Sequence, residues 1–194
     1  DGFDVAPTAP IDLTNNNTVT LVAKGGGAPA NMPATVANFN SALTQSFSST
    51  TVFAWDSPWA LVFWAKNADT TSVRGHFSAD GNNIWIYSDA GATRLHVDLW
   101  GGSVNGISGL TLTDWNLFTV EWSGTQLTIY SNGDNAGTSV AETAIAPSAG
   151  FKFGVLGAAS FPYNGNISSA LLYSRVLIGG ERDDLYASGA GLFY

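Results

Sequence analysis

The chain has 194 residues, of which 11% are charged, 12% are aromatic and none is cysteine, and its formal net charge is -8. This length suffices for one well-filled core, and the lack of cysteine excludes disulfides and thiolate metal sites. An acidic chain without a cluster of Lys and Arg does not suit nucleic acid or an anionic membrane, because both favour positive charge. No apolar run is long enough to cross a bilayer, so we expect no membrane insertion.

The first segment, residues 1–17, is rich in Pro, Asp, Asn and Thr and has neither helical nor strand periodicity. We expect an extended arm or linker there, followed by one sandwich domain over residues 18–194. The chain begins at Asp1 without an initiator methionine, so we also expect a processed product or a domain of a longer protein. A first strand is predicted over residues 18–24, and short, irregular strands follow it.

The segment of residues 59–65 reads Trp-Ala-Leu-Val-Phe-Trp-Ala and is apolar at every position. A strand that is apolar on both faces is typical of one buried between two layers. We therefore expect this segment in the middle of a sheet.

From Arg74 onward, short alternating segments are separated by turn residues, which predicts an antiparallel meander. In residues 84–87 two isoleucines alternate with Trp and Tyr. In residues 95–100 three aliphatic residues alternate with His, Asp and Trp. Because successive side chains of a strand point to opposite faces, each segment should have one aliphatic face and one polar, aromatic face.

A hairpin is predicted over residues 112–135, where two alternating runs are divided by a Ser-Gly turn and closed by Asn-Gly. The apolar side of this hairpin should carry Phe118, Val120, Trp122, Leu127 and Ile129. The polar side should carry Thr119, Glu121, Thr128 and Tyr130. The hairpin thus combines a core-facing surface with a polar surface that bears an aromatic ring.

After the hairpin, residues 151–155 and 167–173 are predicted strands, and residues 180–187 are the one predicted helix. Acidic residues near the helix start oppose its dipole, and Gly189 follows its end. Many short strands with turns at regular intervals and one late helix predict an all-β fold. We expect a two-sheet antiparallel jelly-roll sandwich with one short C-terminal helix.

The order of these elements resembles a known family. The first motifs are the buried strand of residues 59–66, the meander, and the Trp-x-x-x-x-Val hairpin with its Asn132-Gly133-Asp134 turn. The next is Phe161-x-x-x-Gly165-x-Ile167. The last is the closing segment, in which Leu172-Tyr173-Ser174-Arg175-Val176-Leu177 precedes Glu181-x-x-x-Leu185-Tyr186. Together they resemble the laminin-G-like, concanavalin A-like lectin/glucanase family over residues 50–188. The resemblance implies a jelly-roll sandwich whose members usually bind glycans or proteins, often with calcium, and sometimes hydrolyse glucans.

One set of side chains is predicted to form a ligand-binding face opposite the aliphatic core, if the alternation holds across neighbouring strands. The set comprises Trp85, Tyr87, His96, Asp98, Trp100, Glu121 and Tyr130. Sugars present apolar C–H faces and many hydroxyls, so they suit flat aromatic rings beside carboxylates and imidazoles. The same face could instead dock a protein, because exposed aromatic patches commonly mark interfaces.

Catalysis is less well supported than binding. Hydrolases of this fold class carry a strand motif resembling Glu-x-Asp-x-x-Glu, and this chain has no such motif. Asp98 and Glu121 could share a face on neighbouring strands, which keeps a glycoside hydrolase as the third hypothesis. Neither His76 nor His96 lies in a nucleophile motif, and we interpret both as satisfied structural histidines.

Calcium could bind at either of two loop clusters that offer oxygen ligands. The first cluster is Asp80, Asn82 and Asn83. The second is Asp134 and Asn135 with Asn164. The same residues are ordinary turn formers whose side chains bond nearby backbone, and both interpretations stay open.

The leading hypothesis is a non-catalytic carbohydrate-recognition or adhesion module on a larger surface assembly, of the phage or bacterial appendage type. Its location would be extracellular, on a virion or cell surface, and its partners would be surface glycans and other subunits of that assembly. The alternative is a structural decoration or fibre domain that makes protein–protein contacts. The low charge and the absence of cysteine are compatible with either setting.

Overall fold

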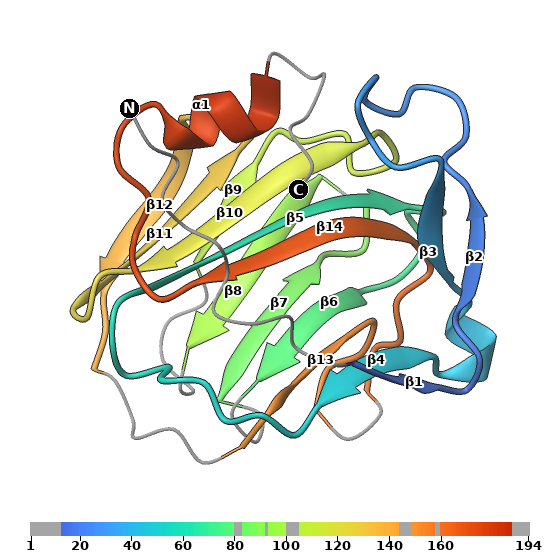
Figure 1. Cartoon of the computed structure of the whole chain (residues 1–194), viewed down its shortest axis with the longest axis horizontal. Helices are drawn as coiled ribbons and strands as arrows, with labels where there is room; N and C mark the ends of the chain where they lie inside the picture. The colour runs from blue at the N-terminus through green and yellow to red at the C-terminus, as the bar shows by residue number, and fades with distance from the viewer. Residues whose placement is uncertain are drawn as a thin grey trace.

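The computed structural model describes residues 13–79, 83–91, 93–99, 105–143, 149–157 and 160–187. Within them, two antiparallel sheets of seven strands each form a sandwich, and one short helix lies against the second sheet (Figure 1). The predicted fold class is confirmed. No helix in these ranges is long and apolar enough to span a membrane.

The first sheet, sheet A, contains the meander and the strands that extend it. In spatial order its strands are β1 (Thr14–Asn16), β4 (Ser46–Ser49), β13 (Phe151–Phe153), β6 (Arg74–Ala79), β7 (Ile84–Ser88), β8 (Arg94–Leu99) and β9 (Asn105–Ser108). Part of the predicted N-terminal arm is thus the edge strand β1, whereas residues 1–12 lie outside the described residues. The domain boundary after residue 17 stays a prediction.

The second sheet, sheet B, contains the hairpin and the buried central strand. In spatial order its strands are β12 (Asn135–Ala141), β11 (Gln126–Ser131), β10 (Asn116–Trp122), β5 (Trp59–Asn67), β14 (Gly165–Tyr173), β3 (Thr35–Phe39) and β2 (Thr20–Ala23). A 3-10 helix, Ser41–Leu43, follows β3, and α1 spans Glu181–Tyr186. The apolar segment of residues 59–65 forms most of β5, which lies between β10 and β14 in the middle of the sheet, as predicted.

The main core lies between the two sheets and is rich in aromatic rings. The predicted apolar side of the hairpin is confirmed, since Phe118, Val120 and Trp122 are all fully buried in this core. The meander contributes its aliphatic side chains in the same way. Strand alternation therefore correctly predicted which side chains face the core.

The chain moves from one sheet to the other between β9 and β10. The meander ends in sheet A, and the hairpin pairs with β5 in sheet B. The expectation that the hairpin lies beside the meander is therefore wrong. Alternation specifies which side of a strand faces the core, but both sheets of a sandwich face the same core, so alternation cannot say to which sheet a strand belongs.

A second, smaller core covers the outer face of sheet B. Its buried members are Met32, Val36, Ala60, Val62, Trp64, Trp115, Leu117, Leu177 and Leu185. Leu177 and Leu185 come from the C-terminal segment that contains α1, and Met32 comes from the loop after β2. This explains why β5 is apolar on both faces, because it packs against one core on each side.

Candidate ligand-binding face

The structure divides the predicted binding residues between two opposite surfaces. Trp85 and Tyr87 on β7 and His96 and Asp98 on β8 point outward from sheet A, and we call these four residues the aromatic face. Glu121 and Tyr130 belong to β10 and β11 of sheet B, on the other side of the sandwich. Trp100 lies outside the described residues. The single seven-residue face predicted from alternation is therefore wrong.

The aromatic face is assembled by the register of β7 with β8. Tyr87 pairs with His96 and Trp85 with Asp98, so the four side chains form two adjacent cross-strand pairs. The rings of Tyr87 and His96 stack, with centroids 5.0 Å apart and planes 10° from parallel. All four residues are half-buried, which leaves part of each side chain open to a ligand.

The rings of this face are uncharged at neutral pH. Burial lowers the pKa of His96, and the neighbouring Arg94 lowers it further. Burial raises the pKa of the Tyr87 hydroxyl, and the nearby Asp98 carboxylate adds to that effect. The face thus offers a neutral imidazole stacked on a neutral phenol, beside an indole. Uncharged rings of this kind can pack against the apolar C–H surface of a sugar.

Two polar atoms of the face are unpaired within the described chain. The indole Nε1 of Trp85 and the Nδ1 of His96 are buried and have no hydrogen-bond partner there. An unpaired buried polar atom costs free energy, so most such atoms in proteins are paired. Both atoms lie beneath the open surface of the aromatic face, so the groups that a ligand can reach are the exposed parts of the rings and of the Asp98 side chain.

The loop after β13 forms a wall beside the aromatic face. It lies on β6, where Gly75 pairs with Tyr87 of the face. A Cβ atom on Gly75 would come within 2.6 Å of the Leu156 Cγ and 2.8 Å of the Phe161 carbonyl oxygen. Only glycine lets the loop lie this close to the sheet. The Ser78 hydroxyl also donates to the Val155 carbonyl at 3.0 Å, which fixes the start of the wall.

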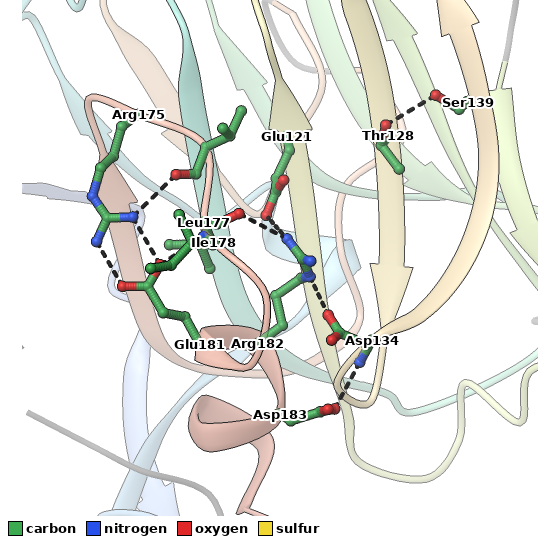
Figure 2. A network of polar contacts seen from close by, with 11 residues as sticks. Glu121, Thr128, Asp134, Ser139, Arg175, Leu177, Ile178, Glu181, Arg182 and Asp183 are labelled. Carbon is green, nitrogen blue, oxygen red and sulfur yellow. Dashed lines mark hydrogen bonds and ion pairs between the residues drawn. The ribbon is translucent and has the colours of Figure 1, made fainter.

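The C-terminal helix engages Glu121 through Arg182 (Figure 2), and Arg182 also lies over the ring of the half-buried Tyr130. Arg182 donates from Nη1 to the Glu121 carboxylate at 2.8 Å and from Nε to the Asp134 carboxylate. Its guanidinium lies 4.0 Å from the centre of the Tyr130 ring. Glu121 is only 5% exposed. We assign both residues a structural role in holding α1 against sheet B.

Other polar contacts hold the same C-terminal segment. Arg175 makes two 2.8 Å hydrogen bonds to the Glu181 carboxylate, and Glu181 also accepts from the Ile178 backbone. The Asp183 carboxylate accepts from the Asp134 backbone N–H at 2.9 Å. Sequence reasoning missed Arg182. The signal for it was its place three residues before Leu185, since residues three apart in a helix share a face.

Burial and pairing act on Glu121 in opposite directions. Burial raises the pKa of its carboxyl, while the hydrogen bond from Arg182 and the positive charge of that residue lower it. The net direction is upward, so the carboxylate depends on Arg182 to stay charged inside the protein. This dependence makes the Glu121–Arg182 pair a structural unit.

The carboxylates do not form a catalytic pair. Asp98 points outward from sheet A and Glu121 from sheet B, so the two cannot act on one substrate, and their expected shared face is wrong. Over the residues that the structure describes, no group of three His, Cys, Asp or Glu side chains gathers in a way that could hold a metal ion.

His76 lies in the main core on β6, with its ring centre 4.6 Å from that of Tyr163. It is fully buried, and burial lowers its pKa to about 3. Neither ring nitrogen has a hydrogen-bond partner among the described residues. A structural role fits this position, but the expectation that the histidine is satisfied by hydrogen bonds is wrong for this part of the chain.

The two calcium candidates have different outcomes. Asp80 and Asn82 of the first cluster lie outside the described residues. In the second cluster Asp134 accepts from Arg182, while the amide of Asn164 donates to the Asp69 carboxylate at 2.6 Å. Both side chains thus bond side chains that are distant in the sequence, not the nearby backbone of a turn. Calcium binding stays a prediction.

The fold and the exposed aromatic face define the chain as a lectin-like β-sandwich. The chain belongs to the concanavalin A-like lectin/glucanases superfamily, whose laminin G family model matches residues 25–181. The resemblance that the sequence motifs carried is thereby confirmed. No curated protein matches the chain in sequence.

Solved structures with the same fold include two toxin binding domains and a carbohydrate-binding module. The binding domain of botulinum neurotoxin serotype D/C has 14% identity and a TM-score of 0.70, over 92% of this chain and 47% of that one. The binding domain of Paraclostridial Mosquitocidal Protein 1 has 16% identity and a TM-score of 0.68, over 92% of this chain and 47% of that one. The Ruminococcus gnavus IT-sialidase CBM40 bound to α2,3 sialyllactose has 15% identity and a TM-score of 0.56, over 74% of this chain and 93% of that one.

The chain thus spans about half the length of the two toxin domains that it resembles. At these identities the similarity describes the fold alone. A ligand therefore has to be inferred from the residues of the aromatic face.

Proposed function

We propose that this chain is a non-catalytic carbohydrate-recognition module that binds glycans on the aromatic face. The observation that carries the proposal is the stacked Tyr87–His96 pair beside Trp85 and Asp98, on the outward side of sheet A. Aromatic rings pack against the C–H faces of sugars, while carboxylate and imidazole groups bond their hydroxyls.

The comparison with solved structures supports this proposal at the level of the fold. The Ruminococcus gnavus module shares the sandwich and was solved with a sialylated sugar, which means that this architecture can present a glycan site. Fold alone does not fix function, so the residues of this chain have to be tested directly.

A glycan array with wild-type protein and the variant Trp85→Ala tests the proposal. The wild type should bind a defined group of glycans, and the variant should lose at least about tenfold in affinity with an unchanged melting temperature. Leu21→Ala is the matched control, because Leu21 is 68% exposed on β2 of sheet B. Absence of wild-type binding to every glycan, or equal binding by Trp85→Ala, would contradict the proposal.

A structural decoration or fibre domain is the second candidate, because the molecule also exposes aliphatic side chains. Leu21 and Leu43 are 68% and 54% exposed, on β2 and on the 3-10 helix. Exposed apolar side chains favour protein contacts when they are contiguous. Sedimentation of the wild type and of a Leu21→Ala/Leu43→Ala variant distinguishes this structural role from the glycan-binding role. Association that the double variant abolishes, together with no glycan binding, would favour this second role.

The positions of the acidic residues support a non-catalytic role. Glu121 and Glu181 are tied to Arg182 and Arg175, and Asp98 has no second carboxylate in its cross-strand pair with Trp85. Glycoside hydrolysis needs two carboxyl groups about 5 to 10 Å apart on either side of the sugar bond. Incubation of the wild type with a β-glucan panel should therefore release no product.

We place the module on a larger surface assembly, exposed outside the cell on a virion or a cell surface. A chain with few charges and no cysteine is compatible with such a setting. Antibody labelling of intact cells or particles from the source organism tests this location. Labelling only after disruption would contradict it.

A further inference from the structure

A hollow of about 300 Å³ lies on the outer side of sheet A, at the edge formed by β1 and β4. Its lining includes Asn16, Thr44, Ser46, Ser48, Lys152 and Val155. Almost all of these side chains end in a hydroxyl, an amide or an ammonium group. The volume is at the lower end of the range for small-molecule sites, which extends over roughly 300 to 1,000 Å³.

The hollow is separate from the aromatic face, although both lie on the same side of sheet A. Strand register runs from Ser48 to Lys152, from Lys152 to Ser78 and from Ser78 to Trp85. Three steps between neighbouring strands correspond to roughly 14 Å. Ser78 is buried and bonds the Val155 carbonyl, so the loop after β13 stands between the two places.

The hydroxyl groups of the hollow are arranged to donate hydrogen bonds. Asn16 Nδ2 donates to the Ser48 hydroxyl oxygen at 2.9 Å and to the Ser46 hydroxyl oxygen at 3.3 Å. A hydroxyl that accepts from an amide still has its own hydrogen to donate. The Asn16 amide has two hydrogens and also lies 3.2 Å from the Thr14 carbonyl, so its shortest bond, to Ser48, is the one that leaves a serine O–H available to an acceptor.

Lys152 adds a positive charge to these donors. Its Nζ donates to the Gly157 carbonyl at 3.1 Å, and an ammonium has three hydrogens, so two remain for other acceptors. Lys152 makes no ion pair with any residue in the described ranges, and no carboxylate among those residues lines the hollow. Arg74, Arg175 and Arg182, by contrast, each face an acidic partner.

We propose that this hollow binds the oxyanion group of an acidic sugar, a carboxylate or a sulfate. Hydroxyl donors and an ammonium with no carboxylate partner among the described residues suit a negatively charged acceptor, because hydrogen bonds to charged groups are about twice as strong as neutral ones. The volume accommodates one sugar ring as well as its acidic group. The site does not depend on the aromatic face, so either site can be present without the other.

NMR titration of the ¹⁵N-labelled full chain tests the site with glucuronate, inorganic sulfate and neutral glucose. Glucuronate and sulfate should shift the backbone amides of β4 and β13, and glucose should not. A shift with sulfate but not with glucuronate would mean that the hollow takes a bare anion and would overturn the acidic-sugar assignment. Equal shifts with glucose and glucuronate would overturn the role of the charge.

Substitutions then identify the groups responsible. Lys152→Met should weaken glucuronate binding at least about tenfold, and Ser48→Ala should weaken it severalfold, because each removes a donor to a charged acceptor. Lys152→Arg keeps the charge and should retain most of the binding, which separates loss of charge from loss of the fold. Lys66→Met, on β5 of sheet B, is the matched control and should bind as the wild type does.

Trp85→Ala distinguishes this site from the proposed glycan function. It should lower the affinity for array glycans at least about tenfold and leave the glucuronate shifts at β4 and β13 unchanged. Unchanged affinity in Lys152→Met, or loss of the glucuronate shifts in Trp85→Ala, would overturn the proposal of a separate site.

Discussion

The two outer faces of the sandwich begin from the same sequence pattern and end with different roles. On sheet A, Tyr87 and Asp98 project outward beside an indole and an imidazole and remain half-exposed. On sheet B, Tyr130 and Glu121 also project outward, but Arg182 of the C-terminal helix covers them. An aromatic residue beside a carboxylate thus serves as a candidate binding surface on one side and as a docking surface for the chain itself on the other.

This difference shows that alternation defines polar faces but not their availability. A polar face becomes a ligand site only if no other part of the chain packs on it. On sheet B the helix brings apolar side chains that bury the face and one arginine that neutralises its carboxylate. Burial of a charge is tolerated only with such a partner.

The largest expected effect is on sheet B. Arg182→Met should lower the free energy of unfolding by about 3 to 5 kcal/mol, because it leaves the buried Glu121 carboxylate without its partner. Urea unfolding followed by tryptophan fluorescence measures this. Adding Glu121→Gln to the variant should recover part of the loss, since it removes the unpaired charge. A loss below about 1 kcal/mol would mean that the pair is no more important than a surface ion pair.

His76 in the core and His96 on the aromatic face should contribute differently to the loss of stability in acid. His76 has its pKa lowered to about 3 by burial, so below pH 6.5 the unfolded chain binds a proton that the folded chain does not. The contribution of His76 to the free energy of unfolding therefore decreases by about 1.4 kcal/mol for each pH unit as the pH falls from 6.5 towards about 3.

Urea unfolding of the wild type and of His76→Phe from about pH 7 to about pH 4 measures this contribution. The variant should lose stability less steeply on acidification. His96→Phe is the matched control, because the His96 pKa is also lowered but its ring is only half-buried. It should reduce the slope less than His76→Phe does. Equal slopes in the wild type and His76→Phe would contradict the buried, neutral state.

Tyr87 on sheet A and Tyr130 on sheet B test whether the two outer faces have different roles. Tyr87→Ala should weaken binding of array-selected glycans by about tenfold, because it removes the ring that stacks on His96. Tyr130→Ala should leave glycan binding unchanged and lower the melting temperature, because it removes the ring beneath Arg182. Affinities from calorimetry and melting curves for both variants give the result. Loss of glycan affinity in Tyr130→Ala would break the division between the two faces.

The smallest expected effect concerns the second arginine of the C-terminal segment. Arg175 pairs with Glu181 at 2.8 Å, but its side chain is 36% exposed, against 10% for Arg182. Arg175→Met should therefore cost no more than about 1 kcal/mol of unfolding free energy, because solvent screens an exposed pair. Urea unfolding beside Arg182→Met measures the contrast. Equal losses in the two variants would mean that burial does not distinguish these pairs.

Particular residues show how far local pattern carries the prediction of the fold. The hairpin, the meander, the central strand and the helix were all predictable, because Phe118, Val120 and Trp122 recur with the period of a strand and acidic residues open the helix. The candidate site was predictable only in part. Trp85, Tyr87, His96 and Asp98 lie together because they occupy adjacent strands that are also consecutive in the chain.

The covering of Glu121 and Tyr130 could not be predicted in the same way. Arg182 follows Glu121 by 61 positions, and its approach depends on how the C-terminal segment crosses sheet B. The hollow beside Lys152 likewise joins β1, β4 and β13, which are far apart in the chain. Such contacts depend on sheet order, and neither strand period nor turn chemistry specifies sheet order.

The amino-acid sequence alone therefore specified the strands of the meander and the hairpin, the central strand β5, the side of these strands that faces the core and the all-β class, because hydrophobic periodicity is a local property of the chain. It did not specify β1 or β12, whose segments lack that periodicity. Only the tertiary structure decided which sheet each strand joins, which polar face is covered by α1 and which remains open. The physical reason is that both sheets bury their apolar sides in one shared core, so the same alternation is satisfied on either side of it.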